Sequence, residues 1–188
     1  MSFLERKRQL VKDELSHTAA QLIARNGYEE TTVEQIVEAA GVSRRTFFRY
    51  FRSKEDVIVE VLTAVGEHTR AIVAARPDGE PPGASVRHAL EELTRHYLEF
   101  PEKALALTRL ILGTPALRAR YLDRQFEWRQ GVAAELLPRC AGDRLRAELI
   151  SGVGFATLDV AMAGWAEAGD DLPQVLARAL ELSRLDQL

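Results

Sequence analysis

The sequence contains few of the residues that build disulfide-bonded, metal-bound or β-rich proteins. Its one cysteine, Cys140, cannot pair within the chain, which fits a reducing compartment. Two of its four histidines, His88 and His96, lie about two helical turns apart, too far to share an ion, and no other spacing matches a ligand set. No alternating run of Val, Ile or Thr predicts a strand. These absences exclude disulfide scaffolds, zinc modules and β-sheet folds.

Signals for export, membrane insertion and catalysis are also missing. The first residues, MSFLERKRQLVKDEL, are charged throughout and lack the apolar core of a signal peptide, so we expect a cytoplasmic protein. The apolar stretch 152–166 carries Asp159 in its middle and is shorter than the about 20 residues that span a bilayer. We expect a helix buried within protein and no membrane partner. Without a G-x-S-x-G, H-E-x-x-H or phosphate-loop motif, we expect no catalytic residue, no metal and no cofactor.

What is present is an ordinary globular composition with an uneven distribution of charge. The 188 residues are 46% hydrophobic and 28% charged, enough for one large helical domain or a small module joined to a larger one. The net charge is −3, but residues 1–54 hold ten bases against seven acids and the remainder holds 15 against 21. A basic head on an acidic body keeps nucleic acid open as a partner despite the negative net charge.

Apolar residues recur at helical spacing along the whole N-terminal part. Gly27 predicts the end of a first helix. Thr31 and Thr32, followed three residues later by Glu34 and Gln35, both fit a capping box that opens a short second helix. Ser43 predicts the cap of a third helix that runs to about residue 51. Ser53 then opens a long helix, which we expect to continue through about residue 75.

The stretch RPDGEPPG, residues 76–83, is the strongest break and the best boundary candidate. Beyond it, the periodicity predicts helices up to about residues 100, 113, 137, 168 and the C-terminus, with Thr114, Asp143 and Asp171 as caps. We therefore predict an all-α fold with a three-helix head, residues 10–69, and a larger ligand-binding and dimerisation body, residues 70–188. The helix-turn-helix within the head spans about residues 33–52.

The segment GVSRRTFFRYFRSKED combines dense arginine with aromatic residues. On a helical wheel Phe47 and Phe51 share one face, and Arg45 and Arg49 lie opposite them. The wheel places Arg44 and Phe48 on one shoulder, Thr46 and Tyr50 on the other. Such a helix fits a major groove, with its outward face at base edges and its shoulders at phosphates. The alternative is a solvated arginine-rich face on an ordinary helical bundle.

The stretch TTVEQIVEAAGVSRRTFFRYFRSKEDVI, with AAQLIARNGYEE upstream, resembles the DNA-binding head of TetR-type transcriptional regulators. The resemblance covers about residues 10–69 without gaps. It implies a homodimeric repressor, less often an activator, that binds double-stranded operator DNA with an inverted repeat. It also implies that a small-molecule effector enters the body and releases the DNA. The implied DNA contacts are Thr32, Ser43, Arg44, Arg45, Thr46, Phe48, Arg49, Tyr50 and Lys54.

Phe48 departs from the pattern, because the family commonly has tyrosine there and phenylalanine has no hydroxyl for a phosphate. The stretch GWAEAGDDLPQVLARALEL is similar to the branch of the family that contains mycofactocin-type regulators, and this likeness hints at an acyl-CoA ligand. Two other functions stay open: a constitutive DNA-binding or scaffolding dimer without an inducer, and, with no motif to support it, an all-helical enzyme.

The body offers two apolar sets of residues. The predicted helix 143–168 is apolar on nearly every side, and its smaller face, with one face of the last helix, is the expected dimer surface. That set is Leu145, Leu149, Gly152, Val153, Ala156, Val160, Ala163, Val175, Leu176, Ala179 and Leu180. In the alternative, both faces pack within one monomer. Candidate ligand-pocket residues, each of which could equally be plain core, are Tyr97, Phe100, Leu110, Tyr121, Phe126, Trp128, Met162 and Trp165.

Overall fold

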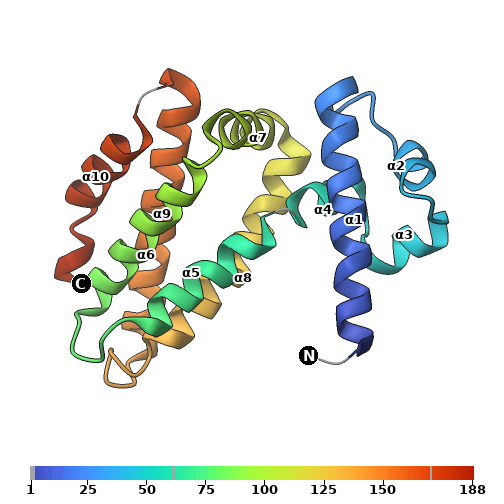
Figure 1. Cartoon of the computed structure of the whole chain (residues 1–188). Helices are drawn as coiled ribbons and strands as arrows, with labels where there is room; N and C mark the ends of the chain where they lie inside the picture. The colour runs from blue at the N-terminus through green and yellow to red at the C-terminus, as the bar shows by residue number, and fades with distance from the viewer. Residues whose placement is uncertain (1–2, 61, 170) are drawn as a thin grey trace. The chain divides into compact units, whose positions relative to one another are not determined.

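The computed structural model describes residues 3–60, 62–169 and 171–188, and all regular structure in these ranges is helical (Figure 1). This confirms the predicted all-α fold. The helices are α1 (Phe3–Asn26), α2 (Val33–Ala39), α3 (Arg44–Tyr50), α4 (Lys54–Glu60), α5 (Thr63–Ala75), α6 (Pro82–Tyr97), α7 (Pro101–Gly113), α8 (Pro115–Leu136), α9 (Arg144–Ala168) and α10 (Leu172–Ser183), followed by the short 3-10 helix η1 (Leu185–Gln187).

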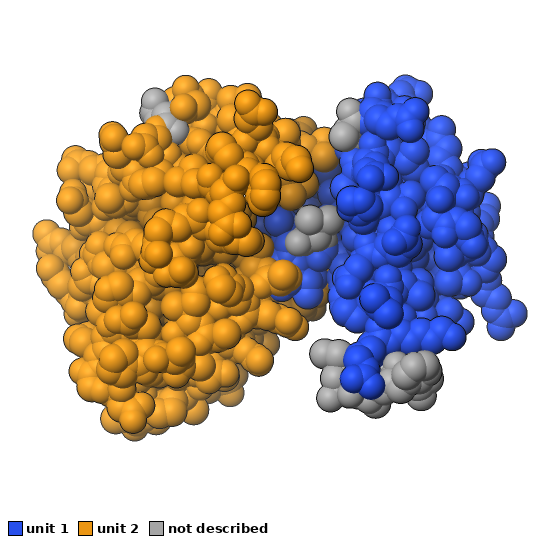
Figure 2. Space-filling view, viewed as in Figure 1, with its two compact units in different colours: residues 1–63, 116–121 blue, residues 64–115, 122–188 orange. Residues whose placement is uncertain are grey.

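The chain forms two compact units, coloured separately in Figure 2. Unit 1 comprises residues 1–63 and 116–121, and unit 2 comprises residues 64–115 and 122–188. Unit 1 therefore ends a little before the predicted boundary at residue 69, and it also takes in the start of α8. The proline-rich stretch 76–83 does not separate the units, because it lies inside unit 2 as the loop between α5 and α6.

Unit 1 contains the predicted helix-turn-helix. Thr32 caps α2 through a complete capping box: its hydroxyl accepts from the Gln35 N–H at 3.2 Å, and its own N–H donates to the Gln35 side chain at 2.8 Å. Ser43 caps α3 by accepting from the Thr46 N–H at 3.1 Å. Gly41, with a φ of 64°, forms the turn between the two helices. The predicted caps and turn of unit 1 are confirmed, whereas Thr114 and Asp171 precede α8 and α10 without a capping hydrogen bond from the side chain.

The core of unit 1 draws on five helices. Its buried apolar residues include Leu15, Ala19, Ile36, Phe47, Phe51, Val57, Ile58 and Leu117. Polar contacts also join helices that are distant along the chain. Lys12 of α1 lies 2.8 Å from the Glu60 carboxylate of α4. Arg120 of α8 lies 3.1 Å from Asp56 at the start of α4. The start of α8 therefore belongs to the head by both packing and charge.

The prediction of one helix over residues 53–75 is wrong. α4 ends at Glu60, α5 begins at Thr63, and the Leu62 N–H donates to the Val59 carbonyl at 2.9 Å. Residue 61 lies outside the described residues. All four residues from 57 to 60 are buried. A straight surface helix buries only one stripe of its residues, so four consecutive buried residues fit a short, enclosed helix better than a long one.

Unit 2 packs α6, α9 and α10 against one another. Its fully buried residues include Val86, Leu90 and Leu93 of α6, Ile150 and Leu158 of α9, and Leu176 and Leu180 of α10. Two glycines allow close crossings of helices, because a Cβ added to Gly154 would overlap Val86, and one added to Gly66 would overlap the Trp128 ring. Small residues in α5 and α9 thus set the distance at which neighbouring helices pack.

Among the described residues, α9 is the one helix that is long and apolar enough to cross a membrane by length and composition alone. Core helices of globular proteins pass the same test, and 44% of its apolar window is buried inside the protein. The bulky residues Ile150, Leu158 and Trp165 account for a buried face. Leu149 and Val160 lie on a face that remains exposed. The expected packing within protein therefore holds for one face of α9.

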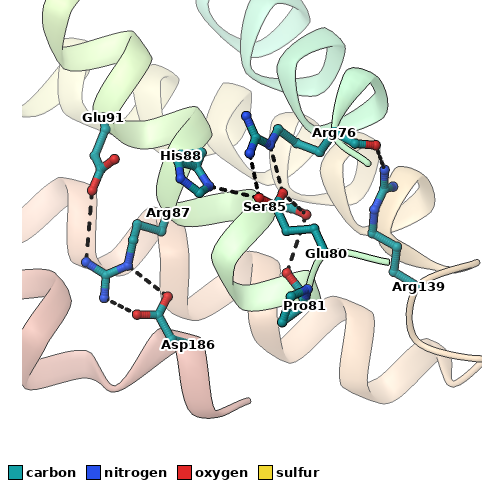
Figure 3. A network of polar contacts seen from close by, with 9 residues as sticks. All are labelled: Arg76, Glu80, Pro81, Ser85, Arg87, His88, Glu91, Arg139 and Asp186. Atoms are coloured by element: carbon teal, nitrogen blue, oxygen red, sulfur yellow. Dashed lines mark hydrogen bonds and ion pairs between the residues drawn. The ribbon is translucent and has the colours of Figure 1, made fainter. Parts of the chain in front are cut away.

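The α5–α6 loop is organised around the carboxylate of Glu80 (Figure 3). Arg76 donates to both of its oxygens, at 2.8 and 2.6 Å, and the Ser85 hydroxyl donates at 2.8 Å. His88 Nδ1 lies 3.2 Å from the same carboxylate. The hydrogen bonds from Arg76, opposed by burial and reinforced by Ser85, lower the pKa of Glu80 from its ordinary 4.5 to about 2. The loop that resembles a linker in sequence is therefore fixed.

We expect Glu80→Gln to destabilise unit 2 near neutral pH by about 1.5–3 kcal/mol, the range for hydrogen bonds to a charged group. Because the folded pKa lies below the unfolded one, this stabilisation is complete above about pH 4.5 and is lost as the pH falls toward 2. Thermal unfolding from pH 7 to pH 3 should therefore show the Tm difference from wild type shrinking with acid. Asp78→Asn, an exposed acid in the same loop, is the control. A difference that grows with acid would contradict this assignment.

Candidate nucleic-acid interface

Helix α3 presents two different faces. Phe47 is 0% and Phe51 4% exposed, and their ring centroids are 5.6 Å apart. Arg45 and Arg49 are exposed, as the helical wheel predicts. The anchor of two phenylalanines is confirmed. Because α3 has only seven residues, this burial rather than its own hydrogen bonds gives the helix its stability and its direction.

One shoulder of α3 carries Arg44 and Phe48. The Arg44 guanidinium lies 2.8 Å from the Glu34 carboxylate of α2 and 5.7 Å from the centre of the Phe48 ring. Phe48 is 48% exposed and meets Phe47 edge to face, with centroids 5.3 Å apart. Phe48 is therefore a surface residue that supports a cation. Glu34 was not among the predicted site residues, although an acid beside an arginine-rich helix could have drawn attention to it.

The other shoulder carries Thr46 and Tyr50. The Arg49 guanidinium donates to the Tyr50 hydroxyl at 3.2 Å and lies 4.9 Å from the centre of its ring. The Thr46 hydroxyl lies 3.0 Å from the Ser43 hydroxyl, so both are linked to the cap of α3. The predicted contacts differ in exposure: Thr32, Ser43, Arg44, Arg45, Phe48 and Arg49 are exposed, and Thr46 and Tyr50 are half-buried.

Lys54 has a structural role that the sequence did not indicate. Its ammonium donates to the backbone carbonyls of Tyr28 (2.8 Å) and Thr31 (3.1 Å) and lies 4.0 Å from the centre of the Tyr28 ring. The Tyr28 hydroxyl donates to Glu55. Burial alone would raise the pKa of Glu55, but hydrogen bonds from Tyr28 and Ser53 hold it below its usual value. Contact of Lys54 with phosphate stays a prediction, and two of its three donors already fasten the loop before α2 to α4.

The predicted dimer residues divide into exposed and buried sets. Leu145, Leu149 and Val160 of α9 are 76, 52 and 64% exposed. Ala156 and Ala163 are exposed as well, and Gly152, Val153, Val175 and Ala179 are half-buried. Leu176 and Leu180 are 1% and 0% exposed, because α10 uses them to cover α9 within the same unit. The interface prediction is therefore wrong for these two side chains.

The predicted pocket residues also differ in burial. Trp128 and Trp165 are buried, and Tyr97, Leu110, Tyr121 and Met162 are half-buried. Phe100 and Phe126 are 63% and 55% exposed, so neither is enclosed within the chain. Tyr121 falls in the segment that belongs to unit 1.

No Arg or His in the sequence stands out as a polar anchor for the pocket, but the structure buries a polar side chain in the interior of the body. Gln125 is 2% exposed and donates to the Asp159 carboxylate at 2.5 Å. Burial, with a smaller contribution from the charge of Asp159, raises the pKa of Tyr97 above its ordinary value. Asp159 interrupts the apolar run of α9, and this interruption was the signal in the sequence that could have identified the cluster.

Both parts of the chain match known protein families. The family of bacterial regulatory proteins named tetR matches residues 15–61, and the MftR C-terminal domain matches residues 80–184. The chain is 37% identical to the HTH-type transcriptional regulator TcmR of Streptomyces glaucescens, an alignment that covers 98% of this chain and 85% of that protein. The second match confirms the likeness of the body to mycofactocin-type regulators.

Two solved structures share the fold. FadR of Thermus thermophilus, a TetR-family repressor in complex with lauroyl-CoA, has a TM-score of 0.62 at 27% identity and covers 94% of this chain and 95% of its own. FadR of Bacillus subtilis, in complex with stearoyl-CoA, has a TM-score of 0.61 at 19% identity, covering 90% and 96%. The second likeness is one of fold alone.

Arg45 is exposed on the outward face of α3, so we expect Arg45→Ala to weaken binding to a cognate DNA site by about 1–3 kcal/mol and to blur the preference at one base position. Competition binding with single-base variants of the site measures both effects. Arg178→Ala makes the same charge change on an exposed residue of unit 2 and is the control. An equal loss on cognate and unrelated DNA would show that Arg45 contacts phosphate instead.

Proposed function

The chain belongs to the TetR family of bacterial regulatory proteins, and we propose that it is a homodimeric repressor whose palindromic operator is released by a small-molecule effector. The observation that carries the proposal is α3, a capped helix held inward by two phenylalanines with arginines on its outer face. A regulator of chromosomal DNA acts in the cytoplasm. We propose no catalytic activity, since the family is one of regulators.

The exposed face of α9 supports the homodimer. Leu145, Leu149 and Val160 are more than half exposed on one helix, with small residues between them. A continuous apolar face of this kind is typical of a surface that another protein covers. A second copy, related by a two-fold axis, would place the same face opposite itself and would present two α3 helices to the two halves of an inverted repeat.

The relatives support an effector that binds the body. The two FadR structures contain lauroyl-CoA and stearoyl-CoA, and the C-terminal match covers residues 80–184 of this chain. The rival function is a constitutive DNA-binding dimer without an inducer. A metabolite that raises the Tm and at the same time abolishes DNA binding would separate the two. We propose acyl-CoA thioesters as the first compounds to screen.

We expect Leu149→Glu to convert the dimer to a monomer at micromolar concentration, because a charge in the centre of an apolar interface loses its water. Operator affinity should fall about 100-fold or more, since one half-site is then bound without the other. Light scattering and operator titration measure the two effects. Leu122→Glu, at a 46% exposed residue of α8, is the control for oligomeric state. A dimeric Leu149→Glu protein would place the interface elsewhere.

We expect effector and operator to weaken each other's binding by the same factor, about 5–150-fold, because both draw on one conformational equilibrium. Calorimetric titration of lauroyl-CoA into the protein, with and without saturating operator, provides the first measurement. Unrelated DNA of equal length is the control for the effect that the charge of bound DNA has on ligand binding. Ligand affinity that saturating operator leaves unchanged would contradict coupling for that ligand.

A further inference from the structure

Glu34 of α2 forms an ion pair with Arg44 of α3, and folding has little need of this pair. Glu34, in the first turn of α2, lies 2.8 Å from Arg44, and the two side chains are 57% and 64% exposed. Exposed ion pairs contribute little to stability, because water screens them and ordering two long side chains costs entropy. The pair is therefore better explained by what it does on the surface.

Glu34 lies among the predicted DNA contacts. It follows the cap Thr32 by two residues, and its partner Arg44 is the first residue of α3. An acid at a surface that approaches phosphates opposes binding to DNA of any sequence, because the phosphate charge dominates non-specific affinity. Glu34 thus reduces the general attraction that the arginines of the same surface provide.

The Arg44 guanidinium has two neighbours on the surface of unit 1. The Glu34 carboxylate contacts it, and the Phe48 ring lies 5.7 Å from its central carbon. The guanidinium is a planar fork, and bidentate recognition of a guanine edge depends on the orientation of that fork. A fork with two supports keeps more of its orientation in free protein than a lone surface arginine does.

We propose that Glu34 is a positioning residue for sequence specificity: it orients Arg44 toward a base edge and keeps it from neutralising a phosphate. The proposal rests on the proposed DNA-binding function. It predicts that Glu34 lowers affinity for all DNA while it raises the discrimination between operator and other sequences. A helix-stabilising role alone would affect folding but not base preference.

The experiment begins with full-length wild-type protein and a random-sequence DNA library, from which repeated selection yields the operator. Glu34→Gln and the control Glu38→Gln, which removes an exposed acid from the same helix, are then titrated against operator, its single-base variants and unrelated DNA. Each titration is repeated over a range of salt, and the Tm of every variant is recorded.

We expect Glu34→Gln to bind unrelated DNA more tightly, with a salt slope steeper by about 0.9, as one added phosphate contact gives. Discrimination at one base position in each half-site should fall about five- to tenfold, within the range of a bidentate contact. Glu38→Gln should leave base preference unchanged. Preference that stays intact in Glu34→Gln would overturn the proposal, whatever happens to the Tm.

A double-mutant cycle tests whether Glu34 acts through Arg44. In an Arg44→Ala background, Glu34→Gln should cause no further loss of preference at that base position. A further loss there would show that Glu34 reads a base itself, and the positioning role would be wrong. A wild-type protein that enriches no sequence from the library would instead overturn the proposed function, before any variant is compared.

Discussion

The burial of Phe47 and Phe51 is the constraint on which the proposed DNA-binding surface depends. Both rings lie in the core of unit 1, and helix geometry then turns Arg45 and Arg49 away from that core. A helix as short as α3 could not hold this orientation by itself. The buried phenylalanines of the segment therefore fix the direction in which its arginines point.

Helix α3 carries several arginines close together, and two of them have a partner nearby that restrains the side chain. Arg44 has Glu34 and the Phe48 ring, and Arg49 has the hydroxyl and the ring of Tyr50. Side chains that are already held lose less conformational entropy when they bind. The shoulders of the helix thus reduce the entropy that these two arginines would lose in the proposed contact with DNA.

The features that the sequence predicted correctly are local. The caps at Thr32 and Ser43 join residues three apart, and the Phe47–Phe51 pair is set by one helical turn, so composition and spacing suffice for each. The features that it missed depend on contacts between distant segments. Lys54 meets carbonyls 26 and 23 residues away, and Arg120 meets Asp56 from another helix. No periodicity along one helix carries that information, so neither contact could be foreseen.

Helix α9 shows the same limit for apolar residues. Its sequence indicates that both faces avoid water but not which neighbour covers each one. The structure assigns Ile150 and Leu158 to the interior of unit 2 and leaves Leu149 and Val160 exposed. Leu176 and Leu180 were predicted at a dimer surface on the same pattern, yet α10 needs them to cover α9. A helix with the composition of a membrane span can thus belong to a regulator, provided that its own chain covers one face and, as we propose, a second copy covers the other.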